Sequence, residues 1–331
     1  MSVSSILTKD VSFAAELIRQ GLLVAFPTET VYGLGADATN SAAVAGIFEA
    51  KRRPAFDPLI VHLPNSAAAA QLVLEFPPAA GLLAERFWPG PLTLVLPKKP
   101  LISDLVTAGL PGVGIRVPCH PVALRLLNEA ACPIAAPSAN PFGKISPTTA
   151  QHVVDGLGGR IDAVLDGGPC SVGLESTVVS FMHDAPLLLR HGGLPLEMIE
   201  DAIGPIHVAT SNPANDDAAQ SSPGMLSRHY APGIPLRLRA ITENAVPCHG
   251  LRCGLLTVDE ARCGDGFVRV HSVGSTSDLR TCAANFFASL RSLDSAGLDV
   301  IIAHRFPDHG LGVALNDRLE RASRNDLPTI G

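Results

Sequence analysis

The sequence has no excess of basic residues, few aromatic residues and no long apolar run. It contains 25 Lys and Arg against 31 Asp and Glu, a net charge of −6. Sequence-independent binding to a nucleic-acid backbone needs a clear basic excess, so the overall charge argues against that class. No apolar run is long enough to cross a bilayer, and residues 1–20 lack the basic start and apolar core of a signal peptide. We therefore expect a cytoplasmic protein that has no contact with a membrane.

Several common catalytic and metal-binding patterns are also missing. The seven cysteines are scattered and form no Cys-x-x-Cys pair, and the spacing of Cys248, Cys253 and Cys263 fits no common zinc site. There is no Gly-x-Ser-x-Gly, Walker or His-Glu-x-x-His motif. Gly33-Leu34-Gly35 lacks the third glycine of a dinucleotide fingerprint. We expect reduced thiols, no metal held by protein ligands and no protein nucleophile of these types.

What is present is a globular composition in a long chain. The 331 residues are 47% hydrophobic, which predicts one large domain and a smaller one. The expected boundaries are 1–203 for the first domain, 204–233 for a linker rich in Ala, Ser, Asn, Asp and Pro, and 234–331 for the second domain.

The hydrophobic pattern predicts an α/β fold in both domains. In the first domain the expected strands are 22–26, 59–63, 92–96, 113–117, 163–166, 177–181 and 187–189, and the expected helices are 11–20, 41–53, 66–74, 78–87, 121–130, 149–157 and 195–203. Hairpin-like pairing of 163–166 with 177–181 favours a mixed sheet. Residues 28–37 are predicted to be a loop. Strands 251–258 and 298–303 with helices 277–293 and 311–322 predict a small, Rossmann-like α/β second domain.

Polar residues gather at the ends of apolar elements between Pro27 and His62. They are Thr30, Tyr32, Lys51, Arg53 and His62. Ligand sites in α/β folds form at the loop ends of strands, so this stretch is a candidate binding site. The alternative is that the cations complement a helix dipole and that the histidine is a partly buried side chain of the core.

Two later features carry the same ambiguity. Arg116 lies inside an apolar strand, where it needs a partner. That partner is either a nearby carboxylate of the protein or the carboxylate of a substrate held by a bidentate pair. Residues 133–147 are dense in Ser, Asn, Pro and Gly, and they predict either an anion site or an ordinary turn.

The candidate residues are cations and hydroxyls. They are Lys51, Arg53, Arg116, Ser138, Ser146 and Arg190. Such a set suits a reaction that proceeds by positioning and charge neutralisation. Nucleotidyl transfer from ATP, usually with Mg²⁺, is a reaction of this kind.

Six segments, in this order, resemble the YrdC/Sua5 family: PTETVYGLG, KRRPAFDPLIVH, FWPGPLTLVL, VGIRVP, APSANPFGKISPT and GLESTVV. The later SPGMLSRHYAPG and the further domain resemble the long, Sua5-type members. The resemblance implies an open, twisted sheet with a positively charged concave face in the first domain. It also implies that L-threonine, bicarbonate or CO₂, and ATP are combined into L-threonylcarbamoyladenylate and pyrophosphate. The product would pass to the tRNA threonylcarbamoyl transferase machinery for t6A modification, and a weak tRNA contact is compatible with that role.

The resemblance also assigns roles to individual residues. The threonine pocket would consist of Thr30, His62, Arg116, Ser176 and the backbone near Ala136. The ATP site would consist of Lys51, Arg53, Asp57, Gly112, Ser138, Asn140, Ser146 and Arg190. Lys51 and Arg53 would offset the charge of the departing pyrophosphate, and Tyr230, with Arg228 and His229, would close over the nucleotide as a lid. Asp57 stands where relatives commonly have Asn, and its carboxylate would repel phosphate unless Mg²⁺ intervenes. Gly112 could contribute only through its backbone.

The resemblance leaves two other classes of function open. Short members are associated with double-stranded RNA, which suggests a non-catalytic RNA- or tRNA-binding module. Related domains also occur in enzymes that make a carbamoyl-adenylate for metallocentre maturation, but those carry zinc-finger-like parts, and this sequence has no Cys-x-x-Cys array. The second domain could have a structural or docking role only.

Overall fold

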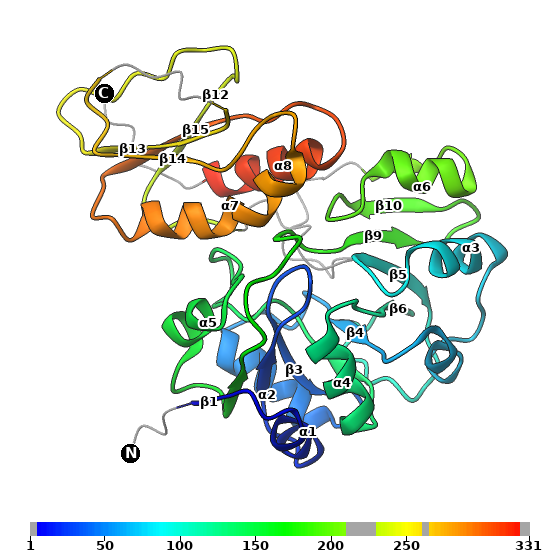
Figure 1. Cartoon of the computed structure of the whole chain (residues 1–331). Coiled ribbons are helices and arrows are strands. Elements are labelled where there is room, and N and C mark those ends of the chain that lie inside the picture. Colours follow the sequence, from blue (N-terminus) through cyan, green and yellow to red (C-terminus); the bar gives the residue numbers. More distant parts are fainter. Residues whose placement is uncertain (1–4, 210–229, 260–264, 325–331) are drawn as a thin grey trace. The chain divides into compact units, whose positions relative to one another are not determined.

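The computed structural model describes residues 5–209, 230–259 and 265–324. The chain forms two compact units (Figure 1). Unit 1 comprises residues 1–142, 147–171 and 175–226, and unit 2 comprises residues 143–146, 172–174 and 227–331. Two short segments that lie between stretches of unit 1 in the sequence therefore belong to the second unit.

Unit 1 is built on an eleven-stranded mixed sheet with the order β1-β8-β2-β3-β7-β4-β6-β5-β9-β10-β11. The strands are β1 (Ile6–Thr8), β2 (Val24–Phe26), β3 (Gly33–Asp37), β4 (Ile60–His62), β5 (Leu92–Pro97), β6 (Gly112–Arg116), β7 (Ile134–Ala135), β8 (Ala163–Leu165), β9 (Thr177–Ser180), β10 (Leu187–Arg190) and β11 (His207–Val208). Parallel and antiparallel pairs alternate irregularly across it. The predicted mixed α/β sheet is thus confirmed.

The pairing predicted for 163–166 and 177–181 is wrong. β8 pairs in parallel with β1 and β2, whereas β9 pairs in parallel with β5 and antiparallel with β10. Closeness in sequence did not decide these partners. Residues 28–37 also differ from the predicted loop, because they contain β3. Its Gly35 allows close packing, since a Cβ there would lie 2.9 Å from atoms of Phe26 and Ile134.

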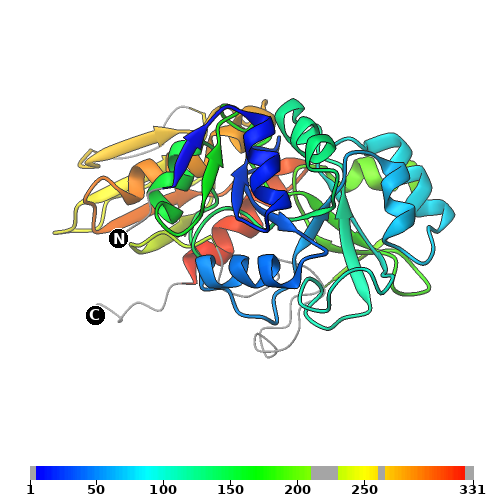
Figure 2. The ribbon, with the colours of Figure 1, turned by 90° about the horizontal axis from the view of Figure 1, so that it is seen from below.

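The helices of unit 1 are α1 (Val11–Arg19), α2 (Ser41–Lys51), α3 (Pro78–Phe87), α4 (Pro121–Ala130), α5 (Ala150–Leu157) and α6 (Leu196–Ile203), and the helix predicted for 66–74 is a shorter 3₁₀ helix, η1 (Ser66–Gln71). The Asn40 side chain accepts the backbone N–H groups of Ala42 and Ala43, which fixes the start of α2. Arg52 ends α2 with a φ of 53° in the left-handed region. α1 and α4 lie side by side (Figure 2).

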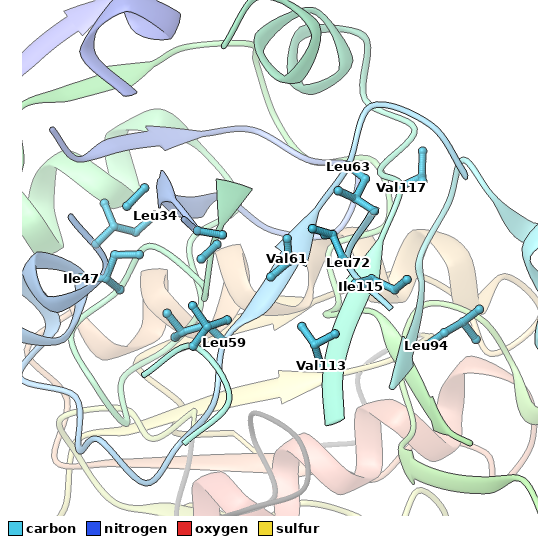
Figure 3. Close-up of a cluster of buried hydrophobic side chains, with 14 of the residues drawn as sticks. Leu34, Ile47, Leu59, Val61, Leu63, Leu72, Leu94, Val113, Ile115 and Val117 are labelled. Carbon is cyan, nitrogen blue, oxygen red and sulfur yellow. The ribbon is translucent and has the colours of Figure 1, made fainter. Parts of the chain in front are cut away.

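The core of unit 1 surrounds the central strands β4, β6 and β5. Figure 3 shows Val61, Val113, Ile115 and Leu94 projecting from these strands into the same apolar cluster as Leu59 and Leu63. These side chains are essentially inaccessible to solvent. Burying so much apolar surface fixes the register of the central strands, and it thereby fixes the polar side chains at their ends.

Unit 2 contains a four-stranded, all-parallel sheet with the order β12-β15-β13-β14. Its strands are β12 (Leu236–Arg239), β13 (Cys253–Thr257), β14 (Arg269–Ser272) and β15 (Val300–His304), and its helices are α7 (Leu279–Asp294) and α8 (Leu311–Ser323). Both helices lie on the same side of this sheet (Figure 1). The expectation of a smaller, Rossmann-like α/β domain is confirmed. In neither unit does a described helix combine the length and the apolar character needed to span a bilayer.

Candidate active site

His62 and Arg116 end two adjacent parallel strands and face each other in register. Their relative exposures are both 3%. NH1 of Arg116 donates to Oγ1 of Thr30 at 2.9 Å. Ala136 joins the same region because its backbone N–H donates to Ile60 of β4 at 2.8 Å. The structure therefore brings four of the five predicted threonine contacts to one place on the sheet.

The fifth predicted threonine contact, Ser176, precedes β9 and is also buried. Its hydroxyl shares a hydrogen bond of 2.8 Å with the hydroxyl of Thr93 on β5. Arg190, at the end of β10, donates from NH2 to the carbonyl oxygen of Ser176 at 2.9 Å and to its hydroxyl at 3.2 Å. A predicted threonine contact thus touches a predicted nucleotide cation.

His62 is held in its neutral form. Burial, and then the positive charge of Arg116, lower the pKa of His62 to about 3. A neutral imidazole carries one donor and one acceptor nitrogen. At neutral pH His62 can therefore orient a polar ligand group, but it adds no charge beside Arg116.

Lys51 is buried at the end of α2, with 1% relative exposure. Its ammonium donates to the carbonyl oxygens of Ser138 and Asn140, and its own carbonyl accepts the N–H of Phe142 at 3.0 Å. Burial, followed by the nearby charge of Arg53, lowers the pKa of Lys51 well below its usual value. Lys51 therefore links the end of α2 to the loop that follows β7.

Arg53 and Asp57 form a second buried group beside Lys51. NH2 of Arg53 lies 2.9 Å from Oδ2 of Asp57, with side-chain exposures of 3% and 0%. Arg53 also donates to the carbonyl oxygens of Asp57 and Pro58, at 3.0 and 2.8 Å. Burial raises the pKa of Asp57, and the charges of Arg53, Lys51 and Arg190 oppose that shift. One carboxylate therefore lies within the field of three predicted phosphate-binding cations.

Gly112 begins β6 and lines a small pocket with Pro58, Thr93, Val95 and Val178 among its other walls. A Cβ at Gly112 would lie 2.8 Å from Sδ of Met182 and 3.0 Å from a methyl of Val95. A side chain here would require Met182 to move, and the glycine itself can contact a ligand only through its backbone.

The last two predicted nucleotide contacts, Ser146 and Tyr230, belong to unit 2. Ser146 is fully buried, and Arg291 of α7 donates to its carbonyl oxygen at 3.3 Å and to that of Ile145. The Tyr230 ring centroid lies 5.8 Å from that of Phe287 and 5.2 Å from the Arg318 guanidinium carbon. The predicted lid residues Arg228 and His229 lie outside the described residues.

Sequence reasoning missed two residues of this region, Glu29 and Thr93. Both are buried. Glu29 ion-pairs with Arg116, so the arginine has the protein carboxylate that its place in an apolar strand requires. The sequence feature that could have identified Glu29 is an acidic residue between two threonines in the PTET segment. Thr93 gave no signal, because a threonine in an apolar strand is ordinary.

Two family models match consecutive parts of the chain. One, described as "Telomere recombination" and covering Sua5, YciO and YrdC proteins, matches residues 16–192. The chain belongs to the Sua5/YciO/YrdC family. The other, described as the C-terminal domain of threonylcarbamoyl-AMP synthase, matches residues 194–324. The resemblance to the long, Sua5-type members of the family is therefore confirmed.

Individual Sua5 relatives span nearly all of the chain. A Bacillus subtilis protein named threonylcarbamoyl-AMP synthase is 47% identical over 319 residues, which are 94% of this chain and 92% of that protein. A Schizosaccharomyces pombe protein of the same name is 36% identical and covers 91% of this chain and 84% of its own length. The crystal structure of Pyrococcus abyssi Sua5 complexed with L-threonine superposes with a TM-score of 0.87 at 40% identity, covering 96% of each chain.

Proposed function

We propose that this protein is an L-threonylcarbamoyladenylate synthase, a nucleotidyltransferase that uses L-threonine, bicarbonate or CO₂, and ATP. The observation that carries the proposal is the contact between Ser176 and Arg190. Ser176 is a proposed contact of the amino acid, and the charge of Arg190 acts on Asp57 together with the charges of Arg53 and Lys51, which suit a triphosphate. Two substrates bound to these groups would lie next to each other.

Each group has a role in the reaction. Arg116 binds the carboxylate of threonine, and His62 and Ser176 contact its polar atoms. The deprotonated threonine amine attacks CO₂, and the resulting carbamate oxygen attacks the α-phosphate of ATP. The bond to the leaving pyrophosphate breaks, and Lys51 and Arg53 offset the charge that develops.

The remaining contacts concern the nucleotide. Ser138, Asn140, Ser146, Arg190 and the backbone of Gly112 bind ATP, and Tyr230 closes over it from the linker 204–233. Mg²⁺ accompanies ATP and neutralises phosphate charge when bound, and Asp57, paired with Arg53, lies beside the cations proposed for the phosphates. Residues 1–203 form the catalytic domain and residues 234–331 the Sua5-type C-terminal domain. The product passes to a cytoplasmic transferase that completes t6A in tRNA.

One incubation tests the proposal. Purified protein is mixed with ATP, Mg²⁺, labelled bicarbonate and each amino acid in turn, and labelled adenylates are separated and identified. We expect a labelled adenylate with threonine and equimolar pyrophosphate. Adenylate formation with no preference for threonine, or with carbamoyl phosphate in place of threonine and bicarbonate, would refute the assignment. Binding of tRNA without any ATP consumption would instead favour an RNA-binding module.

A further inference from the structure

The carboxylate of Glu29 is fixed at both of its oxygens. Oε1 accepts from NH2 of Arg116, and Oε2 accepts the backbone N–H of Cys119 at 3.1 Å. The side-chain exposures of Glu29 and Arg116 are 2% and 4%. A buried carboxylate with two fixed donors has little freedom to move, so it can hold its partner in a single orientation.

Arg116 is in turn held at all three of its nitrogens. Nε donates to the carbonyl oxygen of Gly90 at 3.2 Å, NH1 to Oγ1 of Thr30 at 2.9 Å, and NH2 to Glu29. A guanidinium has five N–H groups. These three bonds use one N–H at each nitrogen, and each terminal nitrogen retains a second N–H. A carboxylate bound end-on needs one donor from each terminal nitrogen.

Glu29 supplies the negative charge that balances the positive charge of Arg116, because the neighbouring His62 and Cys119 are uncharged at neutral pH. His62, in register with Arg116, is neutral because burial and the charge of Arg116 lower its pKa. Burial, and then the charge of Glu29, raise the pKa of the Cys119 thiol to about 11, so this thiol is uncharged at neutral pH. The pair is therefore neutral overall, and a zwitterion can enter without a net charge being buried.

We propose that Glu29 is a positioning residue for the amino-acid substrate: it orients Arg116 so that the two remaining terminal N–H groups meet the threonine carboxylate. The inference rests on the proposed function, since it concerns the substrate of that same site. Glu29 itself does not touch the substrate in this proposal. Its effect on threonine must therefore pass through Arg116, which distinguishes it from a residue that only stabilises the fold.

The test is a double-mutant cycle on the full-length chain. Glu29→Gln keeps the size of the side chain but removes its charge and one acceptor oxygen. We expect the KM for threonine to rise about tenfold, with kcat and the KM for ATP within about twofold of wild type. Arg116→Lys keeps a positive charge but loses the planar fork, and it should also raise the KM for threonine. In the double variant the KM for threonine should stay within about twofold of that of Arg116→Lys alone.

Three outcomes would overturn the role of Glu29. They are an unchanged KM for threonine in Glu29→Gln, equal effects on threonine and ATP, and multiplicative effects in the double variant. Glu16→Gln is the matched control, because Glu16 pairs with Arg19 on the exposed surface; it should change neither constant.

If Glu29→Gln does not fold, Glu29→Asp replaces it. That variant keeps the charge but shortens its reach, and we expect a threonine KM above wild type with the KM for ATP unchanged; an unchanged threonine KM would again refute the role.

Direct calorimetry of threonine binding separates this inference from the proposed function. Wild-type protein that binds threonine but forms no adenylate would contradict the function alone. In that case Glu29→Gln should still weaken threonine binding about tenfold. Equal binding of threonine by wild type and Glu29→Gln would contradict the role of Glu29 and leave the function standing.

Discussion

Arg53 and Asp57 are four residues apart and form an ion pair of 2.9 Å that is almost completely buried. Arg53 additionally holds the backbone carbonyl groups of the same turn. Lys51 and Arg190 also act on the Asp57 carboxylate through their charges. Asp57 thus partly cancels the positive field that we propose for binding triphosphate.

Replacing Asp57 by Asn should therefore strengthen ATP binding. The variant removes one negative charge, while the backbone acceptors of Arg53 remain. We expect the KM for ATP to fall by about threefold to tenfold, with the KM for threonine unchanged. Steady-state kinetics with each substrate varied separately measures both constants. The control is Asp104→Asn, which removes an exposed partner of Lys98. A higher KM for ATP in Asp57→Asn would show instead that the carboxylate supports nucleotide or Mg²⁺ binding.

Replacing Lys51 by Met should abolish adenylate formation and also weaken the fold. Its ammonium is the donor for the Ser138 and Asn140 carbonyl groups, and leaving them without it should cost about 1–3 kcal/mol. Although Lys51 stands at a helix end, it is almost completely buried, so its loss should also affect the fold. Pyrophosphate release and thermal melting measure the two effects. Lys99→Met is the control, since the Lys99 ammonium donates to the carbonyl oxygen of an exposed residue, Ala70.

Removing the Ser176 hydroxyl should affect both substrates, and threonine more than ATP. The hydroxyl touches Thr93 and Arg190, and in our proposal it also faces threonine. For Ser176→Ala we expect the KM for threonine to rise about fivefold to tenfold and that for ATP by about twofold. Ser180→Ala, at a buried serine at the other end of β9, should leave both constants unchanged. Wild-type kinetics in Ser176→Ala would contradict a shared contact.

The low pKa of His62 makes stability depend on pH. In the unfolded chain a histidine takes up its proton near pH 6.5, whereas folded His62 does so only near pH 3. The unfolded state therefore binds more protons between these values, and stability falls as the pH is lowered from 6.5 toward 3, by up to about 1.4 kcal/mol per pH unit from this residue. Urea unfolding of wild type and His62→Asn across this range should show a shallower slope in the variant. Equal slopes would show that His62 is not held neutral.

The sequence was sufficient for the elements that carry strong local signals. The helix predicted from residue 41 begins there and is capped by Asn40, and the apolar runs before and after that helix form β2 and β4. Strand pairing was harder to predict, because β9 finds its partners β5 and β10 through the shared core and not through the nearest strand in sequence. Strand β3 was missed since its glycines serve close packing against Phe26.

The candidate site was predictable as a set of residue types but not as a set of contacts. The pattern left two partners open for Arg116, and the structure supplies one of them, Glu29. The sequence could not reveal this pair, because the two residues are 87 positions apart and meet only when β6 is placed in the sheet. The sequence also could not show that Ser146 belongs to unit 2, because residues 143–146 lie between two segments of unit 1.

A crystal structure with L-threonine and a non-hydrolysable ATP analogue would test the central claim most directly. We predict the threonine carboxylate on the terminal nitrogens of Arg116, with Glu29 still paired to the same guanidinium. The phosphates should lie against Lys51, Arg53 and Arg190, with the α-phosphorus facing the threonine amine. Threonine bound away from Arg116, or phosphates bound away from these three cations, would contradict the account.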